Sequence, residues 1–254
     1  MTPIDIREED GIRYLHFGSD WVQGAMRIRR PFDLHLEYTR DMMAGLLLRE
    51  GVAQARKWPR SVLLVGLGAG SLSKFCYARL PDARVTTVEI DDAVWAAASF
   101  HFKLPAPDAR FCVRIEDGAD YLCGQRPKFD YILIDGYDEH ARVGRLESEA
   151  FYQACRARLK DGGILAANLF GRARQYAAPL GRLAAAFEGR ALALPPSEGG
   201  NVIALATTGN AIALALPELK ARAVALKAAT GLDLRPLLKR LAESGTLDDA
   251  TLRL

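Results

Sequence analysis

The chain has 254 residues, of which 50% are hydrophobic and 26% are charged, a balance typical of a soluble globular protein. Its formal net charge of +3 is too small to indicate binding to nucleic acid or to a membrane surface. The polar start, MTPIDIREEDG, is not typical of a signal or transit peptide, and no apolar run is long enough to cross a bilayer, so we expect a cytoplasmic protein.

The cysteines argue against a disulfide-stabilised protein and against a metal-binding protein. Four are present, without a C-x-x-C pair and without a nearby histidine at the spacing of metal ligands: Cys76, Cys112, Cys123 and Cys155. We therefore expect buried free thiols in a reducing compartment, with no disulfide and no metal site.

The first 60 residues predict short strands followed by one helix. Residues 1–31 have the pattern of short strands, with a Gly-Ser-Asp turn at 18–20. Residues 36–55, LEYTRDMMAGLLLREGVAQA, carry apolar side chains at helical spacing and predict a helix that ends before Trp58 and Pro59.

From residue 61 onward, apolar strands alternate with amphipathic helices. This alternation predicts an α/β fold, a doubly wound and mostly parallel sheet with helices on both faces. Strands around 191–207 are expected to form an antiparallel edge, and residues 216–254 a helical tail. We expect three parts: an N-terminal β-strand region (1–35), a Rossmann-like nucleoside-binding catalytic domain (36–215) and a C-terminal helical extension (216–254).

The most informative feature is a glycine loop directly after the strand at 61–65. It supplies Gly66, Gly68 and Gly70, where the missing side chain lets the backbone approach a ligand closely. A dinucleotide-binding loop has the pattern Gly-x-Gly-x-x-Gly and holds a pyrophosphate at a helix N-terminus. Ser71 stands at the third glycine position here, so the spacing favours a ligand without a pyrophosphate, such as an S-adenosyl sulfonium compound.

Three acidic residues each follow a predicted strand. Glu89 lies where such folds place an acid for the ribose hydroxyls, and Asp117 and Asp135 end two further strands. Because ligands bind at the carboxyl ends of the strands in an open parallel sheet, we expect these acids to converge on one crevice. Ile90 and Gly118, next to two of them, are assigned to the same nucleoside site. The competing interpretation is that the glycines only permit a tight turn and the acids only cap helices.

A second pair of carboxylates indicates the chemistry. A sulfonium donor is already electrophilic, so an enzyme mainly has to align a nucleophile and keep it unprotonated. Asp135 and Asp138 stand three residues apart at a strand end. One carboxylate can accept a proton from an amine while the other holds a cationic tail, so the pair favours an amine acceptor over a carboxylate or phosphate acceptor.

The segments VLLVGLGAGSL, VTTVEIDDAV, IEDGADYL, FDYILIDGYD and ESEAFYQACRARLKDGGILAANL resemble the polyamine synthase family, the spermidine synthases and their relatives. The resemblance covers residues 60–170 well and 10–45 more loosely. It implies a class I methyltransferase-like fold, a homodimer, and aminopropyl transfer from decarboxylated S-adenosylmethionine to a small amine, with neither nucleic acid nor membrane as a partner. It further implies that Glu89 binds the ribose hydroxyls, Asp117 the adenine amino group and Asp138 the amine, and that Asp135 deprotonates the amine.

The same resemblance extends to the acceptor side of the site. Gln23 and Tyr38 stand where the family brings a glutamine and a tyrosine over the site. Tyr137 is a candidate lining residue of the acceptor pocket, with ordinary packing as its alternative role.

The sequence also departs from the family pattern in two places. Spermidine synthases usually carry Gly-Gly-Gly-Asp-Gly in the glycine loop, with the acid near the aminopropyl tail of the donor, and Ala69 stands at that position. The segment after Asp138, usually Asp-Pro-x-Gly-Pro, is DEHARVG at 138–144. The arginines of this segment and of the N-terminal strands either accept an anionic group of the substrate or are solvated surface charges: Arg27, Arg29, Arg30, Arg142 and Arg145.

Three functional hypotheses stay open. The first is aminopropyl transfer with Asp135 as base. The second is methyl transfer from intact S-adenosylmethionine, which the absent acid at Ala69 favours because the intact donor carries its own carboxylate. The third is a nucleoside-binding protein that performs no transfer.

Overall fold

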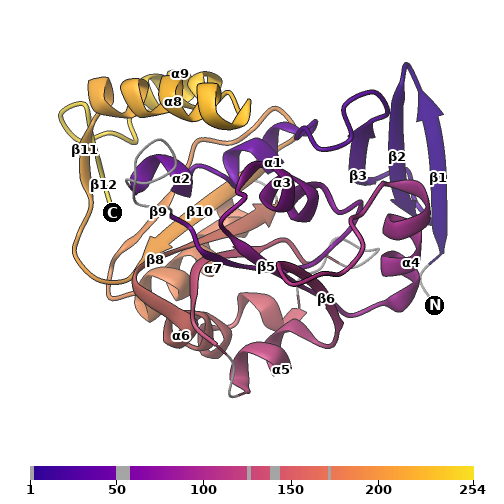
Figure 1. Ribbon diagram of the computed structural model, residues 1–254. Helices are drawn as coiled ribbons and strands as arrows, with labels where there is room; N and C mark the ends of the chain where they lie inside the picture. The colour runs from indigo at the N-terminus through magenta and orange to yellow at the C-terminus, as the bar shows by residue number, and fades with distance from the viewer. Residues whose placement is uncertain (1–2, 50–57, 125–126, 138–143, 171–172) are drawn as a thin grey trace.

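A computed structural model describes residues 3–49, 58–124, 127–137, 144–170 and 173–254 (Figure 1). A seven-stranded sheet with the order β6-β5-β4-β7-β8-β10-β9 forms its centre. The strands are β4 (Ser61–Val65), β5 (Arg84–Glu89), β6 (Phe111–Ile115), β7 (Phe129–Ile134), β8 (Leu159–Phe170), β9 (Ala191–Ala193) and β10 (Asn201–Thr207). The five strands from β6 to β8 are parallel, and β10 is antiparallel to both β8 and β9. The mostly parallel α/β sheet with an antiparallel edge is therefore confirmed.

Helices cover both faces of this sheet. They are α3 (Ser71–Arg79), α4 (Asp92–His101), α5 (Gly118–Cys123), α6 (Glu149–Arg158) and α7 (Ala173–Ala186). Side chains of a strand alternate between two buried cores, so Leu64 packs with α3 and α4 while Val65 packs with α5 and α6. Asp91 caps α4 by accepting from the Ala93 N–H at 2.9 Å. Ser148 caps α6 in the same way.

A small antiparallel sheet precedes the central one. It consists of β1 (Ile4–Glu9), β2 (Ile12–Phe17) and β3 (Val22–Arg27), and Figure 1 shows it at one end of the molecule beside α4. Strand β3 packs directly on the glycine loop, because a Cβ added to Gly24 would lie 2.5 Å from the Cβ of Ala69. The N-terminal strands therefore close over the loop that follows β4.

The prediction of a single helix over residues 36–55 is wrong. The described part forms two short helices, α1 (Glu37–Asp41) and α2 (Gly45–Leu48), and the rest of the range lies outside the described residues. The buried hydroxyl of Tyr131 interrupts the helical ladder: it donates to the carbonyl oxygen of Met42 and accepts from the N–H of Gly45 at 3.1 Å. A tertiary contact has replaced the hydrogen bonds that would have continued the helix.

The C-terminal segment packs two helices on the central domain. These are α8 (Leu216–Thr230) and α9 (Arg235–Glu243), which lie side by side along one edge in Figure 1. The segment is not wholly helical, because β12 (Thr251–Arg253) pairs with β11 (Ala213–Ala215). Arg240 of α9 reaches α1 and bonds to Glu37 and to the buried Asp41.

The structure bears on two expectations from the composition, the absence of a membrane span and the burial of the cysteines. Within the described residues, no helix is long and apolar enough to cross a membrane. All four cysteines are free thiols, but they are not all buried: Cys76 and Cys155 are buried, Cys112 is half-buried and Cys123 is exposed on α5. The expectation of buried thiols is wrong for the last two: Cys112 lies on β6, at the edge of the central sheet, and Cys123 is the last residue of α5.

Candidate active site

A cavity of about 1010 Å³ opens at the carboxyl ends of β4, β5 and β7. It lies where the order of the parallel strands reverses between β4 and β7, the position at which such sheets bind ligands. Its walls come from the glycine loop, β3, α1, η1 (Gly144–Glu147) and the loop between β9 and β10. Among the described residues, no group of three His, Cys, Asp or Glu side chains is arranged to hold a metal ion.

The glycine loop forms the floor of the cavity, and its glycines are required by their backbone conformations. Gly66, Gly68 and Gly70 have φ values of +96°, +50° and +68°, in the region that residues with a Cβ rarely adopt. Gly66 also touches the end of β7, since a Cβ there would overlap the carbonyl oxygen of Asp135. The loop after β4 and the base candidate after β7 are thus held in direct contact.

Glu89 lines the cavity, and its carboxylate also organises the glycine loop. Oε2 accepts from the N–H of Leu67 at 2.9 Å, and Oε1 accepts from those of Ile90 and Asp91 at 2.8 and 3.0 Å. Burial raises the pKa of Glu89, and the three N–H donors oppose that rise. Ile90 is 68% exposed and forms an apolar part of the cavity rim.

Asp117 also has two roles. Its Oδ1 caps α5 by accepting from the N–H groups of Ala119 and Asp120 at 2.8 and 3.0 Å, while the residue lines the cavity together with Gly118. A Cβ on Gly118 would overlap Val65, which is why this position takes no side chain. The helix-capping interpretation is therefore correct for Asp117, but it does not exclude a ligand contact.

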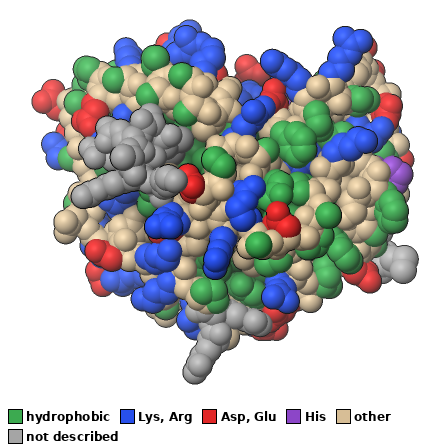
Figure 2. All heavy atoms as spheres, in the orientation of Figure 1, with side chains coloured by type: hydrophobic (Ala, Val, Ile, Leu, Met, Phe, Trp, Pro, Cys, Tyr) green, Lys and Arg blue, Asp and Glu red, His purple; other side chains and the backbone are tan. Residues whose placement is uncertain are grey.

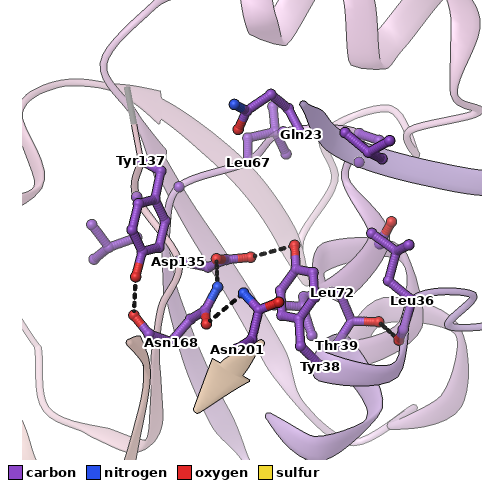
Figure 3. A pocket seen from close by; sticks show the side chains of 18 of the residues that line it. Gln23, Leu36, Tyr38, Thr39, Leu67, Leu72, Asp135, Tyr137, Asn168 and Asn201 are labelled. Carbon is purple, nitrogen blue, oxygen red and sulfur yellow. Dashed lines mark hydrogen bonds between the residues drawn. The ribbon is translucent and has the colours of Figure 1, made fainter. Parts of the chain in front are cut away.

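Asp135 lies at the centre of the hydrogen-bond network that Figure 3 shows. Its Oδ1 accepts from the Nδ2 of Asn168 at 2.8 Å, and its Oδ2 accepts from the hydroxyl of Tyr38 at 3.2 Å. Burial raises the pKa of the Asp135 carboxyl to about 6, and the two donors oppose the rise. A carboxylate with this pKa is mostly ionised at neutral pH and can accept a proton.

The other predicted acceptor-side residues line the same cavity. Gln23 projects from β3, and Figure 3 shows it beside Leu67, across the cavity from Asn168. The hydroxyl of Tyr137 donates to the backbone carbonyl of Asn168 at 2.7 Å. Burial raises the pKa of Tyr38 well above its usual value, so this hydroxyl stays protonated and donates to Asp135. Asp138 lies outside the described residues.

The proposed cluster of arginines is not assembled around the cavity. Arg145 does line it, but Arg145 is bonded to Asp120 at 2.8 Å and is mostly exposed. Arg29 and Arg30 line a separate small hollow, and Arg27 donates to the Nδ1 of His35 at 3.2 Å. Arg142 lies outside the described residues.

Sequence reasoning missed two amide side chains in the site. Asn168 lies on β8 and is 4% exposed, and Asn201 on β10 donates through Nδ2 to the Oδ1 of Asn168 at 3.1 Å. The available signal was a single amide in each of two otherwise apolar strands, ILAANLF and NVIALA. Their pairing depends on the antiparallel register of β10 against β8.

Comparison with known proteins decides the family. Residues 46–169 match the family model of the spermine/spermidine synthase domain. The polyamine aminopropyltransferase of Neisseria meningitidis is 36% identical over 241 residues, which cover 95% of this chain and 89% of the relative. The chain belongs to the polyamine aminopropyltransferase family.

Solved structures agree with this family in fold and include a methyltransferase. A probable spermidine synthase from Corynebacterium glutamicum is 19% identical with a TM-score of 0.71, covering 96% of this chain and 91% of that one. Human methyltransferase-like protein 13, solved in complex with SAH, is 26% identical with a TM-score of 0.68, and the match covers 78% of this chain and 93% of that one. The polyamine aminopropyltransferase family and class I methyltransferases therefore share this fold, and the residues within the cavity have to distinguish the two activities.

Proposed function

We propose that this protein transfers an aminopropyl group from decarboxylated S-adenosylmethionine to a small amine, with Asp135 as the base. The single observation that carries the proposal is the environment of Asp135, a buried carboxylate bonded to Asn168 and Tyr38 at the edge of a nucleoside-sized cavity. Membership in the polyamine aminopropyltransferase family supports the same activity.

The proposed step is an in-line displacement at carbon. The lone pair of the acceptor nitrogen attacks the methylene carbon bound to the sulfonium sulfur, and the carbon–sulfur bond breaks with its electron pair moving to sulfur. The products are a neutral thioether and an alkylated ammonium group, which loses one proton to Asp135. The charge of the sulfonium supplies the driving force, so the protein mainly contributes alignment and an unprotonated nucleophile.

Each wall of the cavity has a proposed role in this step. Glu89 and Asp117 would hold the ribose hydroxyls and the adenine amino group, with Ile90 and Gly118 against the adenine ring. The glycine loop, with Gly66, Gly68 and Gly70, would let the donor approach the backbone. Gln23, Tyr38, Tyr137 and Asp138 would surround the acceptor amine.

Methyl transfer from intact S-adenosylmethionine is the second candidate, and Ala69 is the observation that favours it. Ala69 is 2% exposed and in contact with Gly24, so this position offers no carboxylate to the aminopropyl ammonium group of a decarboxylated donor. An intact donor, which carries a carboxylate of its own, would meet no repulsion there. The similarity to human methyltransferase-like protein 13 also supports this candidate.

Parallel calorimetric titrations with decarboxylated and intact S-adenosylmethionine would separate the candidates. Aminopropyl transfer predicts tighter binding of the decarboxylated donor, followed by turnover with a diamine that Asp135→Asn abolishes while donor binding is kept. Preference for the intact donor would contradict the proposal and support methyl transfer. Tight binding of the thioether product without turnover of either donor would support a non-catalytic nucleoside-binding protein.

We also propose that the chain is divided into three parts, with boundaries at residues 35 and 215. We further propose that the protein is a homodimer in the cytoplasm. Exposed apolar side chains near the small sheet support an interface: Phe100 on α4 is 83% exposed and Trp21 is 52% exposed. Figure 2 shows hydrophobic side chains concentrated on the same side of the molecule as β1–β3 and α4. Light scattering on Phe100→Asp and on the unaltered protein tests this, because a dimer through this surface becomes a monomer.

A further inference from the structure

A chain of amide hydrogen bonds crosses three neighbouring strands and ends on the base candidate. Asn201 on β10 donates through Nδ2 to the Oδ1 of Asn168 on β8 at 3.1 Å. Asn168 donates through its own Nδ2 to the Oδ1 of Asp135, after β7, at 2.8 Å. Figure 3 shows these two hydrogen bonds as dashed lines that meet at Asn168, with the Tyr38 hydroxyl bonded to the other oxygen of the carboxylate.

The direction of this chain is fixed by the asymmetry of the amide group. An amide has one end that only accepts and one end that only donates, and a carboxylate can only accept. If Asn168 turned over, its Oδ1 would face the carboxylate of Asp135, and its NH₂ group would face the NH₂ group of Asn201. The carboxylate of Asp135, which can only accept, therefore selects the orientation of Asn168, and the Nδ2 donor of Asn201 stabilises that same orientation from the other side.

The backbone holds both amides in place. The carbonyl oxygen of Asn168 accepts from the hydroxyl of Tyr137 at 2.7 Å, and Asn168 is buried within β8. The carbonyl oxygen of Asn201 accepts from the N–H of Ser197 at 2.9 Å, which closes the turn before β10. These bonds fix the backbone from which the two side chains project, and both side-chain hydrogen bonds are present in the structure.

We propose that Asn168 and Asn201 are positioning residues for Asp135: Asn201 orients the Asn168 amide, and Asn168 in turn orients the Asp135 carboxylate and keeps it ionised. The inference rests on the proposed role of Asp135 as base and assigns a function to β10, the antiparallel strand outside the parallel core. The carboxylate is then left with its remaining lone pairs directed at the cavity, where an amine proton would arrive.

Four other polar side chains lie near Asp135 or line the same cavity. Tyr38 from α1 is the second donor to the carboxylate, and Tyr137 in the following loop contacts Asn168. Glu89 and Asp117 line the same cavity from the ends of other strands. The hydrogen bonds of Tyr38 to Asp135 and of Tyr137 to the backbone of Asn168 do not involve the side chain of Asn201, so a change at position 201 leaves both in place.

The test reverses the polarity of the chain without changing its shape. In Asn201→Asp the donor facing Asn168 becomes an acceptor, so Asn168 turns over and presents Oδ1 to Asp135. A matched control is Thr207→Val on the same strand, which removes a buried hydrogen bond to the carbonyl oxygen of Gly163 at the far end of β10. Both variants lose a polar contact in β10, but only the first changes the groups around Asp135. Because Asn201→Asp also adds a negative charge, Asn201→Leu, which removes the donor without adding a charge, has to raise the pKa of Asp135 as well.

Carbon-13 NMR titration of labelled aspartate carboxyls in the substrate-free protein is the deciding measurement, with Asp135→Asn to assign the signal. The pKa of Asp135 should rise by about one unit in Asn201→Asp and stay unchanged in Thr207→Val. Asn201→Gln, which keeps a donor, should restore part of the shift. An unchanged pKa in Asn201→Asp, or an equal rise in Thr207→Val, would overturn the proposal.

Turnover separates this inference from the proposed function. If aminopropyl transfer occurs, Asn201→Asp should lower kcat at pH 6.5 about threefold more than at pH 8.5, with donor affinity unchanged, because a pKa that rises from about 6 to about 7 leaves about a third of the ionised carboxylate at pH 6.5. If no transfer occurs but the NMR shift is present, the positioning role stands and the proposed reaction fails. If transfer occurs and neither the shift nor the pH effect is found, the reaction stands and the positioning role is overturned.

Discussion

The carbonyl oxygen of Asp135 lies against Gly66, at a distance that leaves no space for a Cβ on the glycine. Gly66 also has a φ of +96°, so a substitution there meets both a steric and a conformational barrier. The contact ties the loop that would receive the donor to the residue that would deprotonate the acceptor.

Gly66→Ala should therefore lower the free energy of unfolding by about 2 kcal/mol or more and abolish donor binding. Gly181→Ala is the matched control, because Gly181 is in α7 with open space around it and no positive φ. That change should stabilise the protein by about 0.5 to 1 kcal/mol. Urea denaturation and calorimetry with the donor check both variants, and equal stability of the two would contradict this account of the loop.

Tyr38→Phe should shift the pH dependence of turnover. Burial raises the pKa of Asp135 to about 6, and the Tyr38 hydroxyl lowers it by bonding to the ionised form. Loss of that donor raises the pKa further, so the acidic limb of kcat/KM should move upward by about half to one pH unit. A pH–rate profile measures this, and a uniform loss of activity at all pH values would instead indicate that Tyr38 only contacts the substrate.

The convergence of Glu89, Asp117 and Asp135 could be predicted from the sequence because parallel strands bring their carboxyl ends to one edge. The Asn168–Asn201 pair could not be predicted, since it depends on the register in which Asn201 pairs with Phe170 of the neighbouring strand. Register follows from packing and turn geometry, which no single segment encodes.

The prediction of one helix over residues 36–55 was wrong for a similar reason. Its apolar periodicity is real, and Met42, Leu46 and Leu47 are buried as that periodicity requires. The break between α1 and α2 comes from the hydroxyl of Tyr131, a residue far away in the sequence. Local propensity indicated the buried face of this segment correctly but not its backbone hydrogen bonds.

Lys74 should make the stability of the protein depend on pH above neutrality. Lys74 is 1% exposed and its Nζ donates to the carbonyl oxygen of Phe102 at 2.7 Å, and burial lowers the pKa of this group from 10.5 to about 7. Between these two values the unfolded chain binds more protons than the folded chain, so stability rises with pH. The slope should approach about 1 kcal/mol per pH unit.

Lys74→Met should remove that slope. Urea denaturation at pH 7 and pH 9.5 should show a clear gain in stability for the unaltered protein and none for the variant, which should lose stability because burial raises the pKa of the Cys76 and Cys155 thiols. Lys220→Met, at an exposed position on α8, serves as the control and should keep the slope. A slope that persists in Lys74→Met would show that another group causes it.

Arg240 of α9 should stabilise the helix that carries Tyr38. It bonds to Glu37 at 2.5 Å and to Asp41, whose side chain is 4% exposed. Burial raises the pKa of Asp41 to about 7, and Arg240 opposes that rise. Arg240→Leu should cost about 3 kcal/mol, because it leaves a buried carboxylate without its cation. Arg235→Leu, an exposed pair on the same helix, should cost less than about 1 kcal/mol.

The sign of the pH dependence distinguishes this explanation from simple loss of packing. Without Arg240 the folded pKa of Asp41 rises further above its unfolded value, so stability is lost as pH increases through about 7 and beyond. Urea denaturation of Arg240→Leu should therefore show a larger deficit at pH 8.5 than at pH 6. Adding Asp41→Asn removes the carboxylate, and the double variant should recover part of the stability, with a smaller deficit at pH 8.5 than Arg240→Leu alone. A deficit in Arg240→Leu that is already independent of pH would mean that Arg240 acts through its aliphatic packing and not through its charge.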